Sequence, residues 1–131
     1  MRIIIAGGRD FNDYELMVKS FSLMIQKLID SGFITRPILK ENIEIVSGTC
    51  GGADNHGEKL AVRHQFMLTQ MPAAWKQYGK KAGYIRNVEM ARYAVEDKGV
   101  LLAFWDGKSR GTKHMIDIAK EYNLKGFVVS Y

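Results

Sequence analysis

The sequence has little of what several classes of protein depend on. Its single cysteine, Cys50, cannot form an internal disulfide, which excludes a disulfide-stapled scaffold and agrees with a reducing compartment. No apolar run reaches the roughly 18 residues that a membrane-spanning helix requires. The apolar run at residues 1–6 stops at Gly7 and is too short for a signal peptide. We therefore expect a cytoplasmic protein with no membrane partner.

Motifs for common metals and cofactors are also missing. None of the three histidines has the spacing to other histidines, cysteines or carboxylates that metal ligands show, so we expect no metal site. The pattern Gly-x-x-x-x-Gly-Lys-Ser/Thr does not occur, and Gly48-x-x-Gly51-Gly52 has the wrong spacing for Gly-x-Gly-x-x-Gly. These absences argue against ATP hydrolysis and NAD-dependent hydride transfer, and we expect no cofactor.

What is present is enough for one hydrophobic core. The chain has 131 residues, of which 47% are hydrophobic, and no repeat or low-complexity segment divides it. We expect a single domain over residues 1–131. The net charge is +5, from 19 basic and 14 acidic residues. This charge suits an anionic ligand, although it is common in proteins that bind nothing acidic.

Short apolar runs alternate with amphipathic segments along the chain. We expect strands at residues 2–6, 43–46, 66–71, 100–105 and 126–130. We expect helices from residue 12 or 13 to 29, from the loop 47–54 to residue 64, and at 85–96 and 112–122, with connections at 33–42 and 75–81. Regular strand–helix alternation indicates right-handed crossovers. The predicted fold is α/β, a Rossmann-like three-layer sandwich with a mostly parallel sheet.

Three glycine-rich turns follow predicted strands. In such a sheet, ligands bind outside the carboxyl ends of the strands, near the point where the strand order reverses. The turn from Asp106 to Thr112 leads into a helix whose first N–H groups are unpaired and attract phosphate. One such turn indicates little, but three that carry hydroxyl and arginine side chains predict a ligand site. The expected ligand-binding residues are Gly7, Gly8, Arg9, Asp10, Ser47, Gly48, Gly51, Gly52, Asp54, Arg86, Asn87, Trp105, Asp106, Gly107, Ser109, Arg110, Gly111 and Thr112.

Four motifs in the chain carry a resemblance to a known family. They are Ala-Gly-Gly-Arg-Asp-Phe at 6–11, Ser-Gly-x-x-Gly-Gly-Ala-Asp at 47–54, Trp-x-x-Tyr-Gly-x-x-Ala-Gly-x-x-Arg-Asn-x-x-Met at 75–90 and Ala-Phe-Trp-Asp-Gly-x-Ser-x-Gly-Thr at 103–112. Together they resemble the SLOG superfamily, in its branch of small YspA- and YpsA-related proteins. The resemblance implies a Rossmann-like domain that binds nucleotides or nucleotide-derived ligands. Relatives include the Lonely Guy phosphoribohydrolases and DprA, and some members are associated with bacterial and phage conflict systems that use signalling nucleotides.

The resemblance also contains a departure. Lonely Guy enzymes carry Arg-Lys-x-x-Met and Pro-Gly-Gly-x-Gly-Thr-x-x-Glu. Here Arg86 and Met90 fit the first pattern with Asn87 in place of lysine, and Met115 stands at the position of the glutamate. Cleavage of an N-glycosidic bond needs a group that activates water or stabilises the cationic sugar, and methionine does neither. Catalysis would therefore need another carboxylate, and the candidate catalytic residues are Arg86, Glu89, Asp54 and Asp10.

Several of these residues have a structural alternative. Arg86 either binds a phosphate or sugar or pairs with a surface acid, and Asp54 either binds a ribose hydroxyl or caps a helix. Glu89 fits a helix-surface pair better than a catalyst. We expect Cys50 to be a small residue in a tight turn, and His114 to lie on a helix surface. Trp105 is favoured over Trp75 and Tyr78 as a wall of the site.

Three functions follow from these patterns. The first is binding of a nucleoside phosphate, an ADP-ribose-like molecule or a signalling nucleotide, for sensing or sequestration. The second is N-glycoside hydrolysis of nucleoside monophosphates. The third is weak, DprA-like binding of single-stranded nucleic acid through basic and aromatic side chains, namely Lys76, Lys80, Lys81, Arg86, Arg92, Trp75, Tyr78 and Tyr84.

The first and third predicted helices carry apolar residues around much of their circumference. The residues concerned are Met17, Val18, Phe21, Leu23, Met24 and Ile25 in one helix and Val88, Met90, Ala91, Tyr93 and Ala94 in the other. A helix of this kind usually buries two faces. We therefore expect a symmetric homo-oligomer, a dimer or larger, in which Arg86 or Trp75 of one subunit reaches the site of the other.

Overall fold

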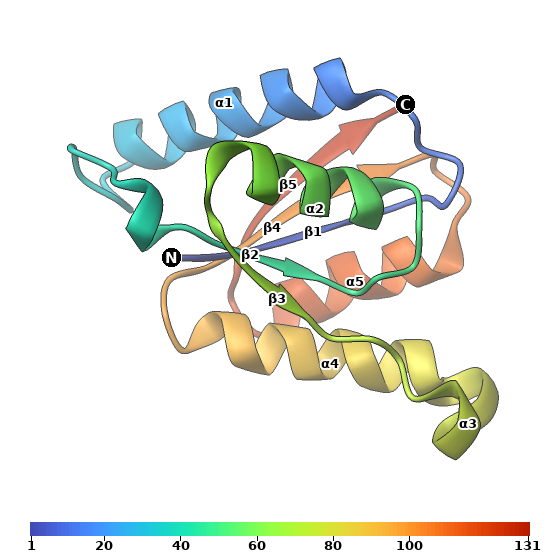
Figure 1. Cartoon of the computed structure of the whole chain (residues 1–131). Coiled ribbons are helices and arrows are strands. Elements are labelled where there is room, and N and C mark those ends of the chain that lie inside the picture. The colour runs from blue at the N-terminus through green and yellow to red at the C-terminus, as the bar shows by residue number, and fades with distance from the viewer.

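The computed structural model describes all 131 residues and places five parallel strands in the order β3-β2-β1-β4-β5 (Figure 1). The strands are β1 (Arg2–Gly7), β2 (Glu44–Ser47), β3 (Met67–Gln70), β4 (Gly99–Trp105) and β5 (Lys125–Ser130). The helices are α1 (Tyr14–Asp30), α2 (Ala53–His64), α3 (Trp75–Tyr78), α4 (Ala82–Val95) and α5 (Arg110–Glu121). The predicted Rossmann-like sandwich is confirmed, and the sheet is wholly parallel.

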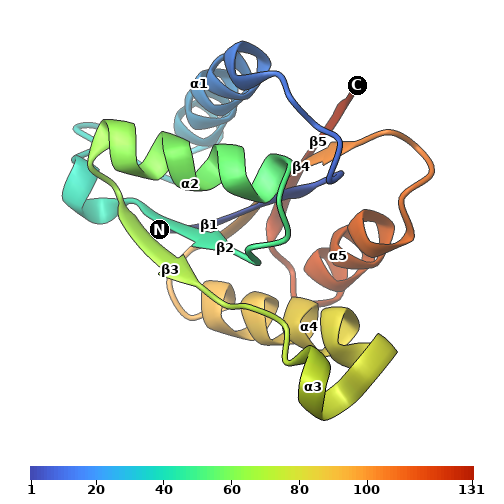
Figure 2. The same cartoon turned by 45° about the vertical axis from the view of Figure 1, so that its right-hand side comes forward.

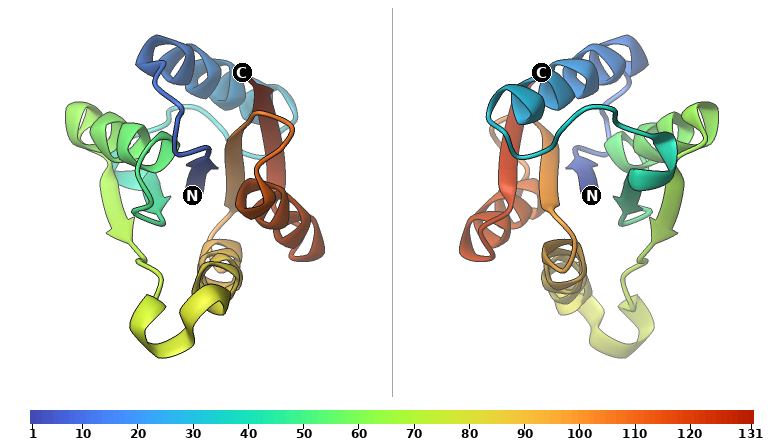
Figure 3. Two further views of the ribbon diagram at one scale, coloured as in Figure 1. Left: turned by 90° about the vertical axis from the view of Figure 1, so that its right-hand side faces the viewer. Right: turned by 90° about the vertical axis from the view of Figure 1, so that its left-hand side faces the viewer.

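The sheet lies between two helical layers, and Figure 3 shows them on its opposite faces. Successive side chains of a strand point to opposite faces, so β1 supplies both layers of the core. Ile3 and Ile5 pack with α1 and α2, whereas Ile4 and Ala6 pack with α4 and α5. This two-sided burial explains why β1 and β4 are near-continuous apolar runs. None of the helices has the length and apolar character needed to cross a membrane.

The segment between β3 and α4 differs from the prediction. Residues 75–81, expected as a loop, form the short helix α3 and a 3₁₀ turn, η2 (Gly79–Lys81), and α4 begins at Ala82 rather than at residue 85. The φ angle of Gly79 is +59°, which breaks the helix between α3 and α4. A second 3₁₀ turn, η1 (Lys40–Asn42), lies in the other expected connection. In Figures 1 and 2, α3 projects from the body of the molecule beside α4.

The apolar circumference of α1 is largely covered by the chain itself. Met17, Phe21 and Met24 are buried, and Val18 and Ile25 pack against the same core from its border. Leu23 is the residue of this group that stays exposed, at 64%. In α4, likewise, Met90, Ala91 and Ala94 are buried. Residues 33–38 and the sheet therefore cover most of the apolar surface of α1 and α4 from which a homo-oligomer is predicted. That assembly stays a prediction.

Candidate functional site

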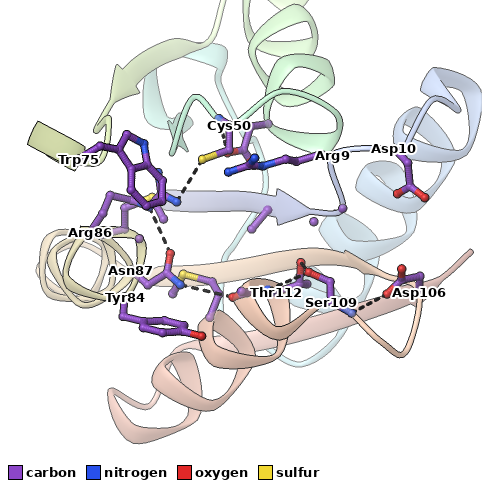
Figure 4. Close-up of a pocket in the computed structure, with 18 of the residues that line it drawn as sticks. Arg9, Asp10, Cys50, Trp75, Tyr84, Arg86, Asn87, Asp106, Ser109 and Thr112 are labelled. Carbon is purple, nitrogen blue, oxygen red and sulfur yellow. Dashed lines mark hydrogen bonds between the residues drawn. The ribbon is translucent and has the colours of Figure 1, made fainter. Parts of the chain in front are cut away.

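A cleft of about 520 Å³ opens at the carboxyl ends of β1 and β4. The strand order reverses between these two strands, so the cleft lies at the topological switch point where α/β sheets bind ligands. Figure 4 shows that its lining comes from the loop after β1, the loop after β2, α3 with the start of α4, and the loop leading into α5. The cleft thus assembles four segments that are far apart in the sequence.

The loops after β1 and β2 are locked together by backbone contacts. The carbonyl oxygen of Gly8 accepts hydrogen bonds from Phe11 N–H (3.2 Å) and Ala53 N–H (3.1 Å). Gly52, with φ +50°, lies so close that a Cβ there would come within 2.6 Å of the Arg9 backbone. The hydroxyl of Tyr131, after β5, donates to Asp10, and burial and this carboxylate raise the pKa of Tyr131 to about 12. These contacts fix one wall of the cleft.

The loop after β4 builds the start of α5. Asp106 Oδ1 accepts hydrogen bonds from Lys108 N–H and Ser109 N–H, each 2.8 Å long. These two N–H groups, that of Ser109 first, lower the pKa of Asp106, so the carboxylate stays charged. Ser109 caps the helix, and its side chain accepts from Thr112 N–H. Gly111 lines the cleft in the first turn, where helix N–H groups have no intrahelical acceptor.

Arg86, one of the predicted ligand-binding residues, is a buried charged side chain of the cleft. It is only 8% exposed, yet its guanidinium has no carboxylate within 4.0 Å. Its hydrogen bonds go to neutral groups, the carbonyl of Gly48 (2.5 Å), Oδ1 of Asn87 (3.2 Å) and Sγ of Cys50 (3.4 Å). These take one N–H from each nitrogen, and the two remaining N–H groups have no acceptor in the protein. The alternative that Arg86 pairs with a surface acid is therefore wrong.

Asp54 is a buried carboxyl in the same cleft, 5% exposed, in the first turn of α2. Gly52 is the N-cap of α2, so the alternative that Asp54 caps the helix is wrong. Its Oδ2 instead accepts from Cys50 N–H at 2.9 Å. Burial raises the pKa of Asp54 to about 6, although this hydrogen bond and the charge of Arg86 act in the opposite direction. The carboxyl therefore titrates near neutral pH.

Replacing Asp54 with asparagine is expected to stabilise the protein above about pH 7. An acid whose pKa is higher in the folded state binds more protons folded than unfolded, so Asp54 lowers the unfolding free energy as the pH rises from about 4 to about 6. Asparagine keeps an oxygen for Cys50 N–H without the charge. We expect a gain of about 1–3 kcal/mol at about pH 8 and none below about pH 4, measured by urea unfolding.

The exposed Asp117 on α5 provides the control for this experiment. Lys113 donates to its carboxylate, and this contact lowers the pKa of Asp117. The Asp117→Asn variant should therefore show no gain in stability at high pH. Equal behaviour of the two variants would contradict the assignment of the raised pKa to Asp54.

The opening of the cleft has an aromatic rim. Trp75 from α3 and Tyr84 from α4 line it and remain 49% and 44% exposed, and Lys80 lies between them in the sequence. Tyr84 packs at 4.4 Å from the ring of His114. Trp75 is thus neither a core residue nor distant from the cleft, while Trp105, favoured as a wall, does not line it. Trp105 packs against the core on the face of the sheet that α4 and α5 cover, and it donates its Nε1–H to the Ser109 carbonyl.

The structure brings eleven of the eighteen predicted ligand-binding residues to the cleft. They are Gly7, Gly8, Arg9, Asp10, Asp54, Arg86, Asn87, Asp106, Ser109, Gly111 and Thr112. The other seven, which do not line it, are Ser47, Gly48, Gly51, Gly52, Trp105, Gly107 and Arg110. Gly48 and Gly52 contribute indirectly. The carbonyl of Gly48 accepts a hydrogen bond from Arg86, and the absence of a side chain at Gly52 leaves room for the loop after β1. Glu89, a catalytic candidate, is exposed on α4 and also lies outside the lining.

Eight lining residues were not in the predicted set: Ala6, Cys50, Trp75, Lys80, Gly83, Tyr84, Met90 and Met115. A signal for part of them exists in the sequence. Gly83 and Met90 flank Arg86 at three and four residues, so the three lie along one face of a helix. No group of three or more histidine, cysteine or acidic side chains is placed to hold a metal ion.

Fold and cleft together define an α/β protein of the Rossmann-like class with a cleft at its switch point. The chain is 38% identical over 128 residues to the Gene 61 protein of Mycobacterium phage D29, an alignment that covers 94% of this chain and 91% of the phage protein. The chain therefore belongs to the same family as this phage protein. No protein-family model matches the sequence, and no solved structure matches it.

Proposed function

We propose that the cleft binds the phosphate of a nucleotide-derived ligand, for sensing or sequestration. The observation that carries this proposal is the buried guanidinium of Arg86, which has no carboxylate within 4.0 Å. Burying an uncompensated charge costs free energy, and an anion beside it recovers part of that cost. The two free N–H groups of Arg86 and the first turn of α5 supply donors of the kind that phosphate oxygens accept.

The rest of the lining suits the other parts of such a ligand. Trp75 and Tyr84 offer aromatic faces at the opening, on which a base can stack. Asp10 and Asp106 offer carboxylate oxygens that accept hydrogen bonds from sugar hydroxyls. The resemblance to the SLOG superfamily supports the same ligand class. That the chain is a member of this superfamily is part of the proposal. A role in a conflict system follows from the resemblance alone.

Calorimetry with a panel of ligands tests the proposal. The panel contains nucleoside mono- and diphosphates, ADP-ribose and cyclic signalling dinucleotides, with the matching unphosphorylated nucleosides as controls. We expect at least one phosphorylated ligand to bind, and its nucleoside to bind at least about tenfold more weakly, as the loss of one charge-assisted contact predicts. If folded protein at low salt binds no phosphorylated member, the proposal fails.

Replacing Trp75 with alanine is expected to weaken nucleotide binding about tenfold. Stacking of a base on an aromatic side chain contributes about 1–3 kcal/mol. Because Trp75 is half exposed and outside the main core, the unfolding free energy should change little. The affinity for inorganic pyrophosphate, which has no base, is the internal control and should stay constant. Tyr78→Ala provides the matched variant, since Tyr78 is an exposed aromatic of α3 that does not line the cleft.

A second candidate function is hydrolysis of an N-glycosidic bond. The observation that favours it is Asp54, a carboxyl with a pKa of about 6 in the cleft that also holds Arg86, while Met115 occupies the lining without a proton to give. Asp54 would take a proton from the attacking water and return it to the leaving base. Chromatography of nucleoside monophosphates after long incubation measures the released base. An Asp54→Asn variant that binds normally and releases none would support this activity, and no release by the unmodified protein would refute it.

Binding of single-stranded nucleic acid and homo-oligomerisation remain predictions. Lys76, Lys80 and Lys81 are exposed beside the aromatic rim, which agrees with weak, salt-sensitive association. Light scattering tests the oligomer, and a mass near 14.9 kDa at micromolar concentration would refute it.

A further inference from the structure

A hydrogen-bonded chain runs from the cleft to a histidine outside it. Arg86 Nε–H donates to Oδ1 of Asn87 at 3.2 Å. The amide nitrogen of Asn87 lies 3.0 Å from Nδ1 of His114 and 3.4 Å from the carbonyl oxygen of Gly111. Figure 4 shows Asn87 between Arg86 and the first turn of α5. His114 itself does not line the cleft, so the chain connects the cleft to α5 from behind.

The orientation of the Asn87 amide follows from its partners. An arginine Nε–H can only donate, so the atom of Asn87 that faces it must be the oxygen. A backbone carbonyl can only accept, so the atom that faces Gly111 must be the amide nitrogen. Both conditions give the same orientation, and they present an N–H to His114. Nδ1 of His114 must therefore accept, which requires a neutral ring with its proton on Nε2.

We propose that His114 is a positioning residue for Arg86, and that it acts through the amide of Asn87. In its neutral form His114 holds the Asn87 nitrogen, so that Oδ1 faces Arg86 Nε–H and keeps the guanidinium in the wall of the cleft. What the guanidinium binds rests on the proposed function. The positioning itself is a property of the chain without ligand.

Protonation of His114 breaks this arrangement. The imidazolium carries N–H groups on both ring nitrogens, so Nδ1 would face the Asn87 N–H donor at 3.0 Å. Rotation of the amide would satisfy the imidazolium, but it would turn an N–H toward Arg86 Nε and an oxygen toward the Gly111 carbonyl. Without rotation the hydrogen bond between Asn87 and His114 is lost, and with rotation the hydrogen bonds of Asn87 to Arg86 and to Gly111 are lost. We therefore expect acid to loosen Arg86 and to weaken anion binding.

Burial and nearby charges determine the pH at which His114 is protonated. Burial lowers the pKa of His114, while Asp117 and Glu121 on its own helix act in the opposite direction. From α4, the ring of Tyr84 and the amide of Asn87 pack against it. Asp54 in the cleft, with a pKa of about 6, also titrates, and its protonation favours anion binding as the pH falls. The experiment must therefore separate His114 from Asp54.

The His114→Gln variant makes this separation. Glutamine offers an oxygen that accepts from Asn87 but does not titrate, and Asp54 is the same in both proteins. Inorganic sulfate is the probe, because it stays fully ionised over this range. NMR titration at about pH 7.5 and about pH 4.5 measures its affinity, and the lower pH is chosen because burial lowers the pKa of His114 below the ordinary histidine range. We expect the affinity of the unmodified protein to fall about three- to tenfold more than that of the variant, as the loss of one hydrogen bond predicts. The His114→Leu variant, without an acceptor, should bind weakly at both pH values.

The ligand-free NMR spectra decide the inference independently of binding. We expect the Nε2–H form of His114 at neutral pH, and an Arg86 Nε–H signal that shifts as His114 titrates but stays constant in His114→Gln. An Arg86 signal indifferent to His114, or equal pH dependence of sulfate binding in both proteins, would overturn the inference. If sulfate does not bind to the unmodified protein even at the higher pH, phosphate binding fails instead, and the Arg86 signal still tests the positioning role.

Discussion

Replacing Arg86 with methionine is expected to weaken the binding of any phosphorylated ligand about a hundredfold or more. Arg86 is the buried cation of the cleft, and the truncation of a buried charge contact across a binding interface typically costs about 2–5 kcal/mol. Methionine keeps much of the volume and removes the uncompensated charge, while the Gly48 carbonyl and Asn87 lose a donor. These effects on stability oppose one another, so the unfolding free energy should change by only about 1 kcal/mol.

Arg92→Met is the matched control for this prediction. Arg92 lies on the same helix, is exposed, and donates to the hydroxyl of Tyr122 instead of facing the cleft. Both variants lower the net charge equally, so a general electrostatic effect would appear in both. We expect calorimetry to show nearly unchanged binding for Arg92→Met. Equal losses would assign the effect of Arg86 to net charge and not to the cleft.

Replacing Gly52 with alanine is expected to destabilise the protein by at least about 3 kcal/mol, a size typical of substitutions that force atoms to overlap. A Cβ at this position would overlap the Gly8 carbonyl oxygen and come within 2.6 Å of the backbone of Arg9. Backbone cannot move aside as the end of a flexible side chain can, so the loops after β1 and β2 must separate. Because Gly8 and Arg9 line the cleft, ligand binding should be lost with stability.

Gly32→Ala separates steric overlap from the strain of the backbone angle. Gly32 also has a positive φ, +79°, but a Cβ there would have no atom within 4 Å. Its replacement should cost only about 1–2 kcal/mol, the usual penalty of the left-handed conformation. Urea unfolding measures both variants. Similar losses at the two positions would mean that the loops after β1 and β2 are not locked as described.

The sheet could be predicted from the sequence because its signals are local. The apolar, β-branched-rich run around Ile3–Ile5 and the apolar run at residues 100–105 are typical of strands buried on both faces, and their alternation with amphipathic helices predicts the parallel order. The position of the cleft followed from the same rule, since glycine-rich turns after parallel strands share one edge. This is why Gly8, Asp54 and Ser109, which the sequence predicts at that edge, line the cleft.

The remaining lining depends on packing between distant segments, which composition does not encode. The sequence favours Trp105, which ends a predicted strand, over Trp75, which lies in a predicted loop. The structure reverses this order, because the segment expected as a loop forms α3 and brings Trp75 to the cleft. Likewise, nothing local reveals that Arg86 meets Gly48 and Cys50, about 40 residues away on another strand's loop. The role of His114 depends on the Asn87 amide between two helices, and helical periodicity alone made it a surface residue.

The position of β1 in the middle of the sheet also determines when the sheet can be completed during synthesis of the chain. β1 is made first, and one of its edges pairs with β4, where Arg2 is opposite Gly99. At roughly 5–20 residues per second, the ribosome needs several seconds to reach β4 after β2 is complete. During that interval the backbone N–H and C=O groups on this edge of β1 have no partner strand, and unpaired strand edges of this kind let nascent chains associate wrongly or require a chaperone. A chain released before Gly99 would contain most of the residues of the cleft, yet it would lack β4, the strand that pairs with β1 at the switch point.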